Sequence, residues 1–158
     1  MNSFTDIEAV RSILSKISFL GGISGAELDW MLSYFEPLSF KAGDVIAEKG
    51  GQSSHIYIIR SGRVELHLAD ENQDIRKREF TVGDHFGEVS MLSLINDTAT
   101  FVALEDCECI AFSRKSLARL KAENLELFSR VLLNLARDLA RKIQYSDDLM
   151  LRGPTDSE

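Results

Sequence analysis

The hydrophobic pattern changes period twice along the chain, and this change limits the fold more than any other feature of the sequence. Across 38–112, short apolar runs recur at roughly 8–12 residue intervals between Gly, Asp, Asn and Ser, as in an all-β sandwich or barrel. Before and after that block, apolar residues recur at intervals typical of amphipathic helices. The chain therefore predicts an α+β protein that is mainly β, with helices over 5–37, a β-roll over 38–112 and helices over 113–151.

Local signals set the ends of the N-terminal helices. Gly21-Gly22 is expected to end the first helix, because glycine is a frequent residue at helix C-termini. Ser24 stands three residues before Glu27, and this spacing is typical of a capping box at the start of a second helix. Apolar residues at helical spacing predict that this second helix continues to Pro37.

The C-terminal helical block carries a long apolar seam. Ser113 is the expected N-cap of its first helix, and Asn124 is expected to interrupt that helix. Beyond Asn124, Leu and Phe follow the 3-4 spacing of a coiled coil. The long helix either packs only on the domain's own β-roll or also pairs with a second copy, and we expect a homodimer through it. The seam consists of Leu125, Phe128, Leu132, Leu135 and Leu139.

The remaining segments predict one domain over 1–151. The polar stretch 69–74 is expected to be a hairpin loop, and residues 152–158 are expected to form a disordered tail. The N-terminus lacks the pattern of a signal peptide, and no run approaches the roughly 18 apolar residues of a membrane helix. We therefore expect a cytoplasmic protein. Cys107 and Cys109 are expected to be free thiols, because residues so close in sequence rarely pair.

The charge distribution argues against binding to nucleic acids or to anionic membranes. The formal net charge is −7, whereas sequence-independent nucleic-acid binding depends on Lys and Arg contacts with phosphates. Basic residues cluster at 75–78 and at 137–142. Short clusters of this kind are usually solvated surfaces, and we interpret both in that way.

Three motifs within the β-block resemble the cyclic-nucleotide-binding domain superfamily, which includes the catabolite activator protein and the protein kinase A regulatory subunit. They are Lys41-Ala-Gly-Asp-Val-Ile, Tyr57-Ile-Ile-Arg-Ser-Gly-Arg-Val and Gly83-Asp-His-Phe-Gly-Glu. The resemblance covers about residues 12–148. It implies a double-stranded, jelly-roll-like β-roll with N-terminal helices and a long C-terminal helix. It also implies a phosphate-binding cassette.

In the family's cassette, Phe-Gly-Glu leads into a short helix, and eight residues then precede Arg, a small residue, Ala, and Thr or Ser. The Glu accepts a hydrogen bond from the ribose 2′-hydroxyl, backbone amides at the helix start bind the cyclic phosphate, and the Arg pairs with a phosphate oxygen. The resemblance places these roles here on ten positions. They are Phe86, Gly87, Glu88, Val89, Ser90, Met91, Asp97, Thr98, Ala99 and Thr100.

The cassette departs from the family pattern at one position. Phe86-Gly87-Glu88 and Thr98-Ala99-Thr100 are both in frame, so Asp97 occupies the position of the phosphate-binding arginine. No Lys or Arg occurs between Arg78 and Arg114 to replace that cation.

Structural interpretations remain open beside the ligand-binding ones. Gly83 and Gly87 could serve only tight turns, Glu88 could brace the sheet, and Asp97 could be a turn residue whose carboxylate bonds to local amides.

No catalytic arrangement is suggested by the spacing of the remaining polar residues. The three histidines lack the H-x-H pair of the metal-binding cupins, and no Ser-His-Asp or Cys-His set is present. The sequence therefore predicts no enzyme, no metal and no cofactor. Transcription factors of the resembled family carry a helix-turn-helix after this region, and this chain stops at Glu158, so we expect no DNA binding.

The leading hypothesis is a non-catalytic regulatory or interaction module that does not bind cyclic AMP or cyclic GMP with useful affinity. An unidentified protein partner or a second copy would transmit its output. The first alternative is a true cyclic-nucleotide sensor that uses Glu88, backbone amides and a basic residue of the C-terminal helix or of a second subunit, with Asp97 turned away. The second alternative is a pocket for another neutral or cationic small molecule.

Overall fold

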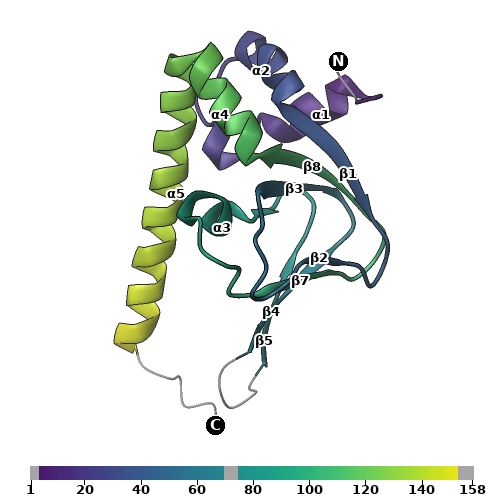
Figure 1. The fold of residues 1–158 in the computed structure, drawn as a ribbon, viewed down its shortest axis with the longest axis vertical. Coiled ribbons are helices and arrows are strands. Elements are labelled where there is room, and N and C mark those ends of the chain that lie inside the picture. Colours follow the sequence, from purple (N-terminus) through teal and green to yellow (C-terminus); the bar gives the residue numbers. More distant parts are fainter. Residues whose placement is uncertain (1–3, 70–74, 153–158) are drawn as a thin grey trace.

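A computed structural model describes residues 4–69 and 75–152 (Figure 1). The described strands are β1 (Phe35–Phe40), β2 (Val45–Ala47), β3 (His55–Ser61), β4 (Val64–Ala69), β5 (Ile75–Phe80), β6 (His85–Phe86), β7 (Thr100–Ala103) and β8 (Cys107–Ser113). The helices are α1 (Ile7–Leu14), α2 (Gly25–Met31), α3 (Glu88–Ser93), α4 (Arg114–Glu123) and α5 (Leu125–Arg152), with short 3₁₀ helices η1 (Ser18–Leu20) and η2 (Leu32–Tyr34).

The described strands form two four-stranded antiparallel sheets, in the orders β1-β8-β3-β6 and β2-β7-β4-β5. Figure 1 shows α1, α2 and α4 above this β-roll and α5 running down its left side, with α3 between α5 and the strands. The predicted β-roll with N-terminal helices and a long C-terminal helix is confirmed. The loop expected at 69–74 lies mostly outside the described residues, but β4 and β5 on either side of it do pair as a hairpin.

The predicted end of the first helix at Gly21-Gly22 is wrong. α1 ends at Leu14, and Gly21 follows the separate 3₁₀ helix η1, where Ile17 and Phe19 turn toward the core.

The predicted N-caps of the second and third helices are present. The Ser24 hydroxyl accepts a hydrogen bond from the Glu27 amide at 3.2 Å, and the Glu27 carboxylate accepts one from the Ser24 amide at 3.0 Å. The Ser113 hydroxyl caps α4. Asn124 separates α4 from α5, as predicted, and its side chain accepts a hydrogen bond from the Leu127 amide at 3.1 Å.

The second N-terminal helix is shorter than predicted. It ends before Phe35, and the chain continues into β1, so the expected helix up to Pro37 is wrong. Phe35 pairs with Phe112 of β8, and their ring centroids lie 5.1 Å apart, which gives the strand an aromatic anchor. Pro37 has no amide hydrogen to donate, and β1 is an edge strand, where a proline is tolerated.

Two hydrophobic clusters hold the layers together. The first lies between the helices and the β1-β8-β3 face, and the second lies between the two sheets. β3 contributes to both, because Ile56 and Ile58 point to the helices while Tyr57 and Ile59 point to the other sheet. This explains its uninterrupted apolar run, since a strand buried on both faces does not alternate.

Cys107 and Cys109 of β8 both point into the cluster between the sheets, and both are free thiols, as predicted. Burial raises the pKa of the Cys109 thiol to about 12.

Three phenylalanines in the same region form a packed group, with ring centroids 4.5 Å apart for Phe86 and Phe101, and 5.7 Å apart for Phe80 and Phe86.

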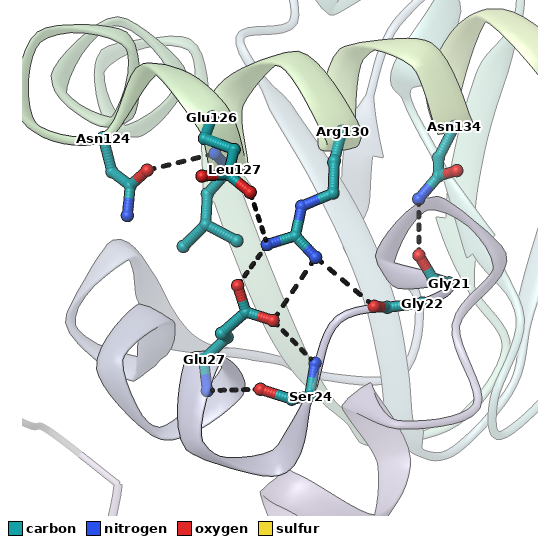
Figure 2. Close-up of polar contacts among 9 residues, drawn as sticks. All are labelled: Gly21, Gly22, Ser24, Glu27, Asn124, Glu126, Leu127, Arg130 and Asn134. Atoms are coloured by element: carbon teal, nitrogen blue, oxygen red, sulfur yellow. Dashed lines mark hydrogen bonds and ion pairs between the residues drawn. The ribbon is translucent and has the colours of Figure 1, made fainter.

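Polar contacts attach the first half of α5 to the N-terminal segment (Figure 2). Arg130 forms an ion pair with Glu27, the capping residue of α2, and donates to the Gly22 carbonyl at 3.4 Å. Asn134 donates to the Gly21 carbonyl at 2.9 Å. The Gly21-Gly22 turn and the α2 capping box therefore also form the docking surface for α5.

The Glu27–Arg130 ion pair makes stability dependent on pH. The Arg130 guanidinium lowers the pKa of the Glu27 carboxyl to about 2 from an ordinary value of 4.5. A carboxyl whose pKa is lower in the folded state than in the unfolded state stabilises the fold fully at pH values above its unfolded-state pKa. This stabilisation is lost as the pH falls through the folded-state pKa. We expect Glu27→Gln to lower the urea midpoint at neutral pH, and the difference from the wild type to shrink between pH 4.5 and about 2. Glu126→Gln, which removes a 3.9 Å exposed ion pair with Arg130, is the control and should show little change. A constant difference at every pH would contradict this prediction.

The seam predicted on α5 coincides only in part with the stripe that packs on the body, since Leu135 is buried and Phe128 packs against the helix-side cluster. The buried apolar residues are Leu127, Val131 and Leu135, whereas Leu125 is 61% exposed and Leu132 is 39% exposed. Of the predicted seam, Leu135 alone is fully buried.

α5 also extends one residue beyond the predicted limit of 151, to Arg152, and the tail beyond it lies outside the described residues. No helix of the described part of the chain has the length and apolar character needed to cross a bilayer.

Candidate ligand-binding site

The cassette forms a turn between β6 and α3 that depends on one glycine. Gly87 has φ of +97°, a left-handed conformation that favours glycine. A Cβ at Gly87 would lie 2.4 Å from the His55 carbonyl oxygen of β3, so the turn lies too close to β3 for a side chain. Glu88 opens α3 directly after this turn. The backbone geometry of the turn is therefore enough to require glycine at position 87, without any contact to a ligand.

A cavity of about 250 Å³ lies between α3, the β5-β4-β7 face and α5. Most of the predicted cassette residues line it, but two do not. Met91 points into the helix-side core, and the Thr100 hydroxyl accepts a hydrogen bond from the Lys49 amide at 3.1 Å. The cassette residues that line it are Phe86, Gly87, Glu88, Val89, Ser90, Asp97, Thr98 and Ala99.

Glu88 is buried, with 1% of its surface exposed, and its carboxylate faces the cavity. Lys142 of α5 forms an ion pair with its Oε1, and His85 Nδ1 lies 3.5 Å from its Oε2. Among the described residues, no donor makes a well-aligned hydrogen bond to either oxygen. Glu88 thus lies in the cavity wall with its charge held by a lysine of the C-terminal helix.

A chain of polar contacts continues from Glu88 toward the N-terminal segment. His85 Nε2 lies 3.3 Å from the Ser18 hydroxyl, which donates to Asp138 of α5 at 2.6 Å. Burial lowers the pKa of His85, and the nearby Lys142 charge lowers it further. The wall of the cavity therefore contacts both η1 and α5.

Asp97 lies at the β7 end of the cavity and is 7% exposed. Its carboxylate accepts a hydrogen bond from the Ser53 hydroxyl at 2.7 Å. Its backbone forms two hydrogen bonds with the neighbouring loop, from the Asp97 amide to the Gly51 carbonyl at 2.8 Å and from the Gly50 amide to the Asp97 carbonyl at 2.7 Å. Within the described ranges, no Lys, Arg or His lies within 4.0 Å of this carboxylate. The Asp97 carboxylate is therefore bonded to a serine that is distant in the sequence, and not to the local amides that the turn interpretation expected.

Two cations that the sequence analysis assigned to solvated surfaces line the cavity. They are Arg78 of β5 and Lys142 of α5. The Arg78 guanidinium lies 4.9 Å from the Phe80 ring centroid and has no carboxylate within 4.0 Å in the described part of the chain. Burial lowers the pKa of Lys142, and the nearby Arg78 charge acts in the same direction. Both clusters are exposed, as interpreted, but one residue of each also lines the cavity.

A third cation, missed at the sequence level, supports the far end of α3. Arg114, the first residue of α4, donates from Nε to the Met91 carbonyl at 3.1 Å and from Nη2 to the Ser90 carbonyl at 3.4 Å. It also donates to the Ser53 carbonyl at 3.3 Å. Arg114 thereby satisfies carbonyls near the end of a short helix, and it does not line the cavity.

Comparisons with known proteins agree with this geometry. The family model described as the cyclic nucleotide-binding domain matches residues 37–124, more than half of the chain. The cyclic AMP receptor protein of Thermus thermophilus is 31% identical over 129 residues, which cover 80% of this chain and 57% of that protein. The chain therefore spans less than two thirds of the length of this relative.

Solved structures share the fold. A cyclic nucleotide-binding domain from Methylobacillus flagellatus superposes with a TM-score of 0.80 at 24% identity, over 95% of this chain and 85% of that one. The regulatory subunit of a cAMP-independent protein kinase A from Trypanosoma cruzi, bound to guanosine, superposes with a TM-score of 0.63 at 26% identity, over 77% of this chain and 44% of that one. The motifs, the β-roll and the matched family model together show that the chain belongs to the cyclic nucleotide-binding domain family.

Proposed function

We propose that this domain is a non-catalytic regulatory module whose pocket does not bind cyclic AMP or cyclic GMP with useful affinity. The observation that carries the proposal is the Asp97 carboxylate, which lines the cavity at the position of the family's phosphate-binding arginine. A cyclic phosphate placed in the cassette would meet a negative charge where the family supplies a positive one.

The size of this effect follows from the two changes at Asp97. Loss of the cation from a buried charge pair costs on the order of 3–5 kcal/mol. A like charge at about 4 Å adds roughly 4 kcal/mol at an effective dielectric constant of about 20. Even half of the sum corresponds to about three decades in the dissociation constant. A micromolar site would therefore become a millimolar one.

Calorimetric titration of the purified chain with cyclic AMP and cyclic GMP tests the proposal. We expect dissociation constants above about 1 mM for both nucleotides. A cooperative thermal unfolding transition of the same sample confirms that the protein titrated is folded. A micromolar dissociation constant for either nucleotide would refute the proposal.

A second candidate is a true cyclic-nucleotide sensor, and the observation that favours it is the pair of cations in the cavity. Arg78 and Lys142 could supply the positive charge that the cassette lacks, while the Asp97 carboxylate is engaged by Ser53. On this mechanism the wild type binds cyclic AMP and Lys142→Gln weakens that binding. The same titration therefore separates the two candidates.

A third candidate is a ligand without a negative charge. The Trypanosoma cruzi relative is described as cAMP-independent and holds guanosine, a nucleoside that lacks a phosphate. Asp97 disfavours a phosphate in the corresponding cassette of this chain, but it does not disfavour an uncharged or cationic ligand. Adenosine and guanosine belong in the same titration series.

We further propose that output passes through protein contacts of α5, with a second copy or with a protein partner, at the expected cytoplasmic location. Leu125 and Leu132 of the predicted seam are exposed, and so are Ile143 and Leu149 toward the other end of the helix. Exposed apolar residues along one helix favour such a contact.

A further inference from the structure

The cavity has opposite charges at its two ends. On the cavity face of the second sheet, Leu66 of β4 pairs with Arg78 of β5 on one side and with Phe101 of β7 on the other. Two strand spacings of about 4.8 Å place Arg78 about 10 Å from Phe101 across the sheet. Asp97 lies just before β7, so the acid and the cations occupy opposite ends of the cavity.

The cationic end opens into a second, larger space. A groove of about 780 Å³ lies between the β4-β5 hairpin and the last turns of α5, and it shares Arg78 and Lys142 with the cavity. Arg76 and Arg141 also line this groove. A ligand in the cavity can therefore extend toward the groove with an anionic group placed between Arg78 and Lys142.

Glu88 provides an independent sign of a missing ligand group. Its carboxylate is 1% exposed and lines the cavity; Lys142 pairs with Oε1, whereas Oε2 has no hydrogen-bond donor within the described residues. A buried carboxylate oxygen without a donor is costly, and a ligand hydroxyl would supply one. Lys142, which now pairs with Glu88, lies beside the position where an anion would bind.

We propose that the cavity binds a hydroxylated phosphomonoester, with the phosphate on Arg78 and Lys142 and a neighbouring hydroxyl on Glu88. The proposal deepens the proposed function, because it rests on this cavity being the ligand site of a regulatory domain. A phosphomonoester carries about −1.5 to −2 charge at pH 7, which two cations match better than the single charge of a cyclic phosphodiester. Arginine binds phosphate oxygens with two parallel hydrogen bonds, whereas lysine acts as a point charge.

Two classes of compound combine a phosphomonoester with neighbouring hydroxyls: nucleoside 5′-monophosphates and sugar phosphates. The apolar wall formed by Leu66, Phe80 and Phe101 offers a surface for a base, which favours the nucleotide. Adenosine 5′-monophosphate and ribose 5-phosphate are the two ligands that separate these sources. Adenosine, inorganic phosphate and cyclic AMP serve as reference ligands.

The test is calorimetry on the full chain with these five compounds, using the wild type, Arg78→Gln and Arg137→Gln. Arg137 lies on the exposed side of α5 and lines neither the cavity nor the groove, so it matches the charge change without touching the site. We expect binding of adenosine 5′-monophosphate that Arg78→Gln weakens by about tenfold to a hundredfold, and that Arg137→Gln leaves unchanged. Equal binding of ribose 5-phosphate would assign the site to sugar phosphates.

Other outcomes overturn the inference in distinguishable ways. If neither phosphomonoester binds and cyclic AMP also fails to bind, the inference fails while the proposed function stands. If adenosine binds as tightly as its 5′-monophosphate and Arg78→Gln has no effect, the phosphate assignment is wrong. If cyclic AMP binds with micromolar affinity while the monoesters do not, both the inference and the proposed function fail. If Arg78→Gln and Arg137→Gln weaken binding equally, net charge alone explains the loss. That result would also contradict the assignment of the phosphate to Arg78.

Discussion

Asp97→Arg is expected to bind cyclic AMP about a thousandfold more tightly than the wild type. The substitution removes a like charge from the cassette and restores a cation at the family's position, while Glu88 and the Gly87 turn remain in place. Calorimetric titration of the variant beside the wild type measures the change. A folded scaffold that gains micromolar affinity from one substitution would show that nucleotide sensing is blocked mainly at Asp97.

Asp97→Asn is the matched control for this prediction. An asparagine removes the like charge and can still accept the hydrogen bond from Ser53, but it supplies no cation. We expect its affinity for cyclic AMP to lie between those of the wild type and Asp97→Arg. If Asp97→Arg unfolds cooperatively and still fails to bind, the charge at this position does not explain the pocket.

Gly87→Ala is expected to destabilise the domain by about 2–5 kcal/mol, a large share of the usual stability of a single domain. A left-handed conformation costs a non-glycine residue about 1–2 kcal/mol. The added Cβ would also lie 2.4 Å from the His55 carbonyl, a backbone atom that cannot move without disturbing β3. Overpacking of this kind adds roughly 1–3 kcal/mol. Urea unfolding measures the loss.

Gly25→Ala provides the comparison for Gly87→Ala. Gly25 begins α2, and a Cβ there would meet no atom within 4 Å. Since alanine has the higher helix propensity, this change should be neutral or slightly stabilising. If the two alanine variants had similar urea midpoints, the close approach of the cassette turn to β3 would have no energetic significance.

Much of the fold could be predicted from sequence because its signals are local. The capping box at Ser24 and Glu27, the Ser113 cap and the break at Asn124 each depend on residues a few positions apart. The start of β1 could not be predicted in this way. Phe35 continues a helical apolar pattern in the sequence, and its pairing with Phe112 overrides that pattern only after the sheet has formed.

The α5 seam shows a different limit. Leu127 and Val131 form the buried stripe, whereas Leu125 and Leu132 fit the coiled-coil spacing equally well in the sequence. The stripe that faces the body is the one that packs into the helix-side cluster, whose other members are distant in the sequence, and the contact of Arg130 with Glu27 agrees with that rotation. Periodicity identifies an amphipathic helix, but it does not identify which of two apolar stripes meets the body.

The sequence predicts which residues form the cassette, but it does not predict which charged side chains meet in the cavity. The family pattern places Glu88 and Asp97 in one cassette, and the structure brings both to one cavity. Arg78 and Lys142 belong to basic clusters that were visible in the sequence, yet their convergence depends on β5 and α5 meeting at the cavity mouth. Clusters of charged residues in the sequence do not indicate that two distant elements will bring them to the same cavity.

The aromatic group shared by the cavity wall and the sheet-to-sheet core bears on how such a domain evolves. Phe80 and Phe86 belong to the buried cluster that joins the sheets, so replacing either would cost several kcal/mol, on the order of 3–5 for a change to alanine. Arg78 is exposed at the rim and has no carboxylate within 4.0 Å in the described part of the chain, and most substitutions of such residues cost little stability. Selection on folding therefore preserves the shape of the pocket and leaves the charge at its rim free to drift. Within one lineage, the fold can outlast its original ligand and be re-used for another.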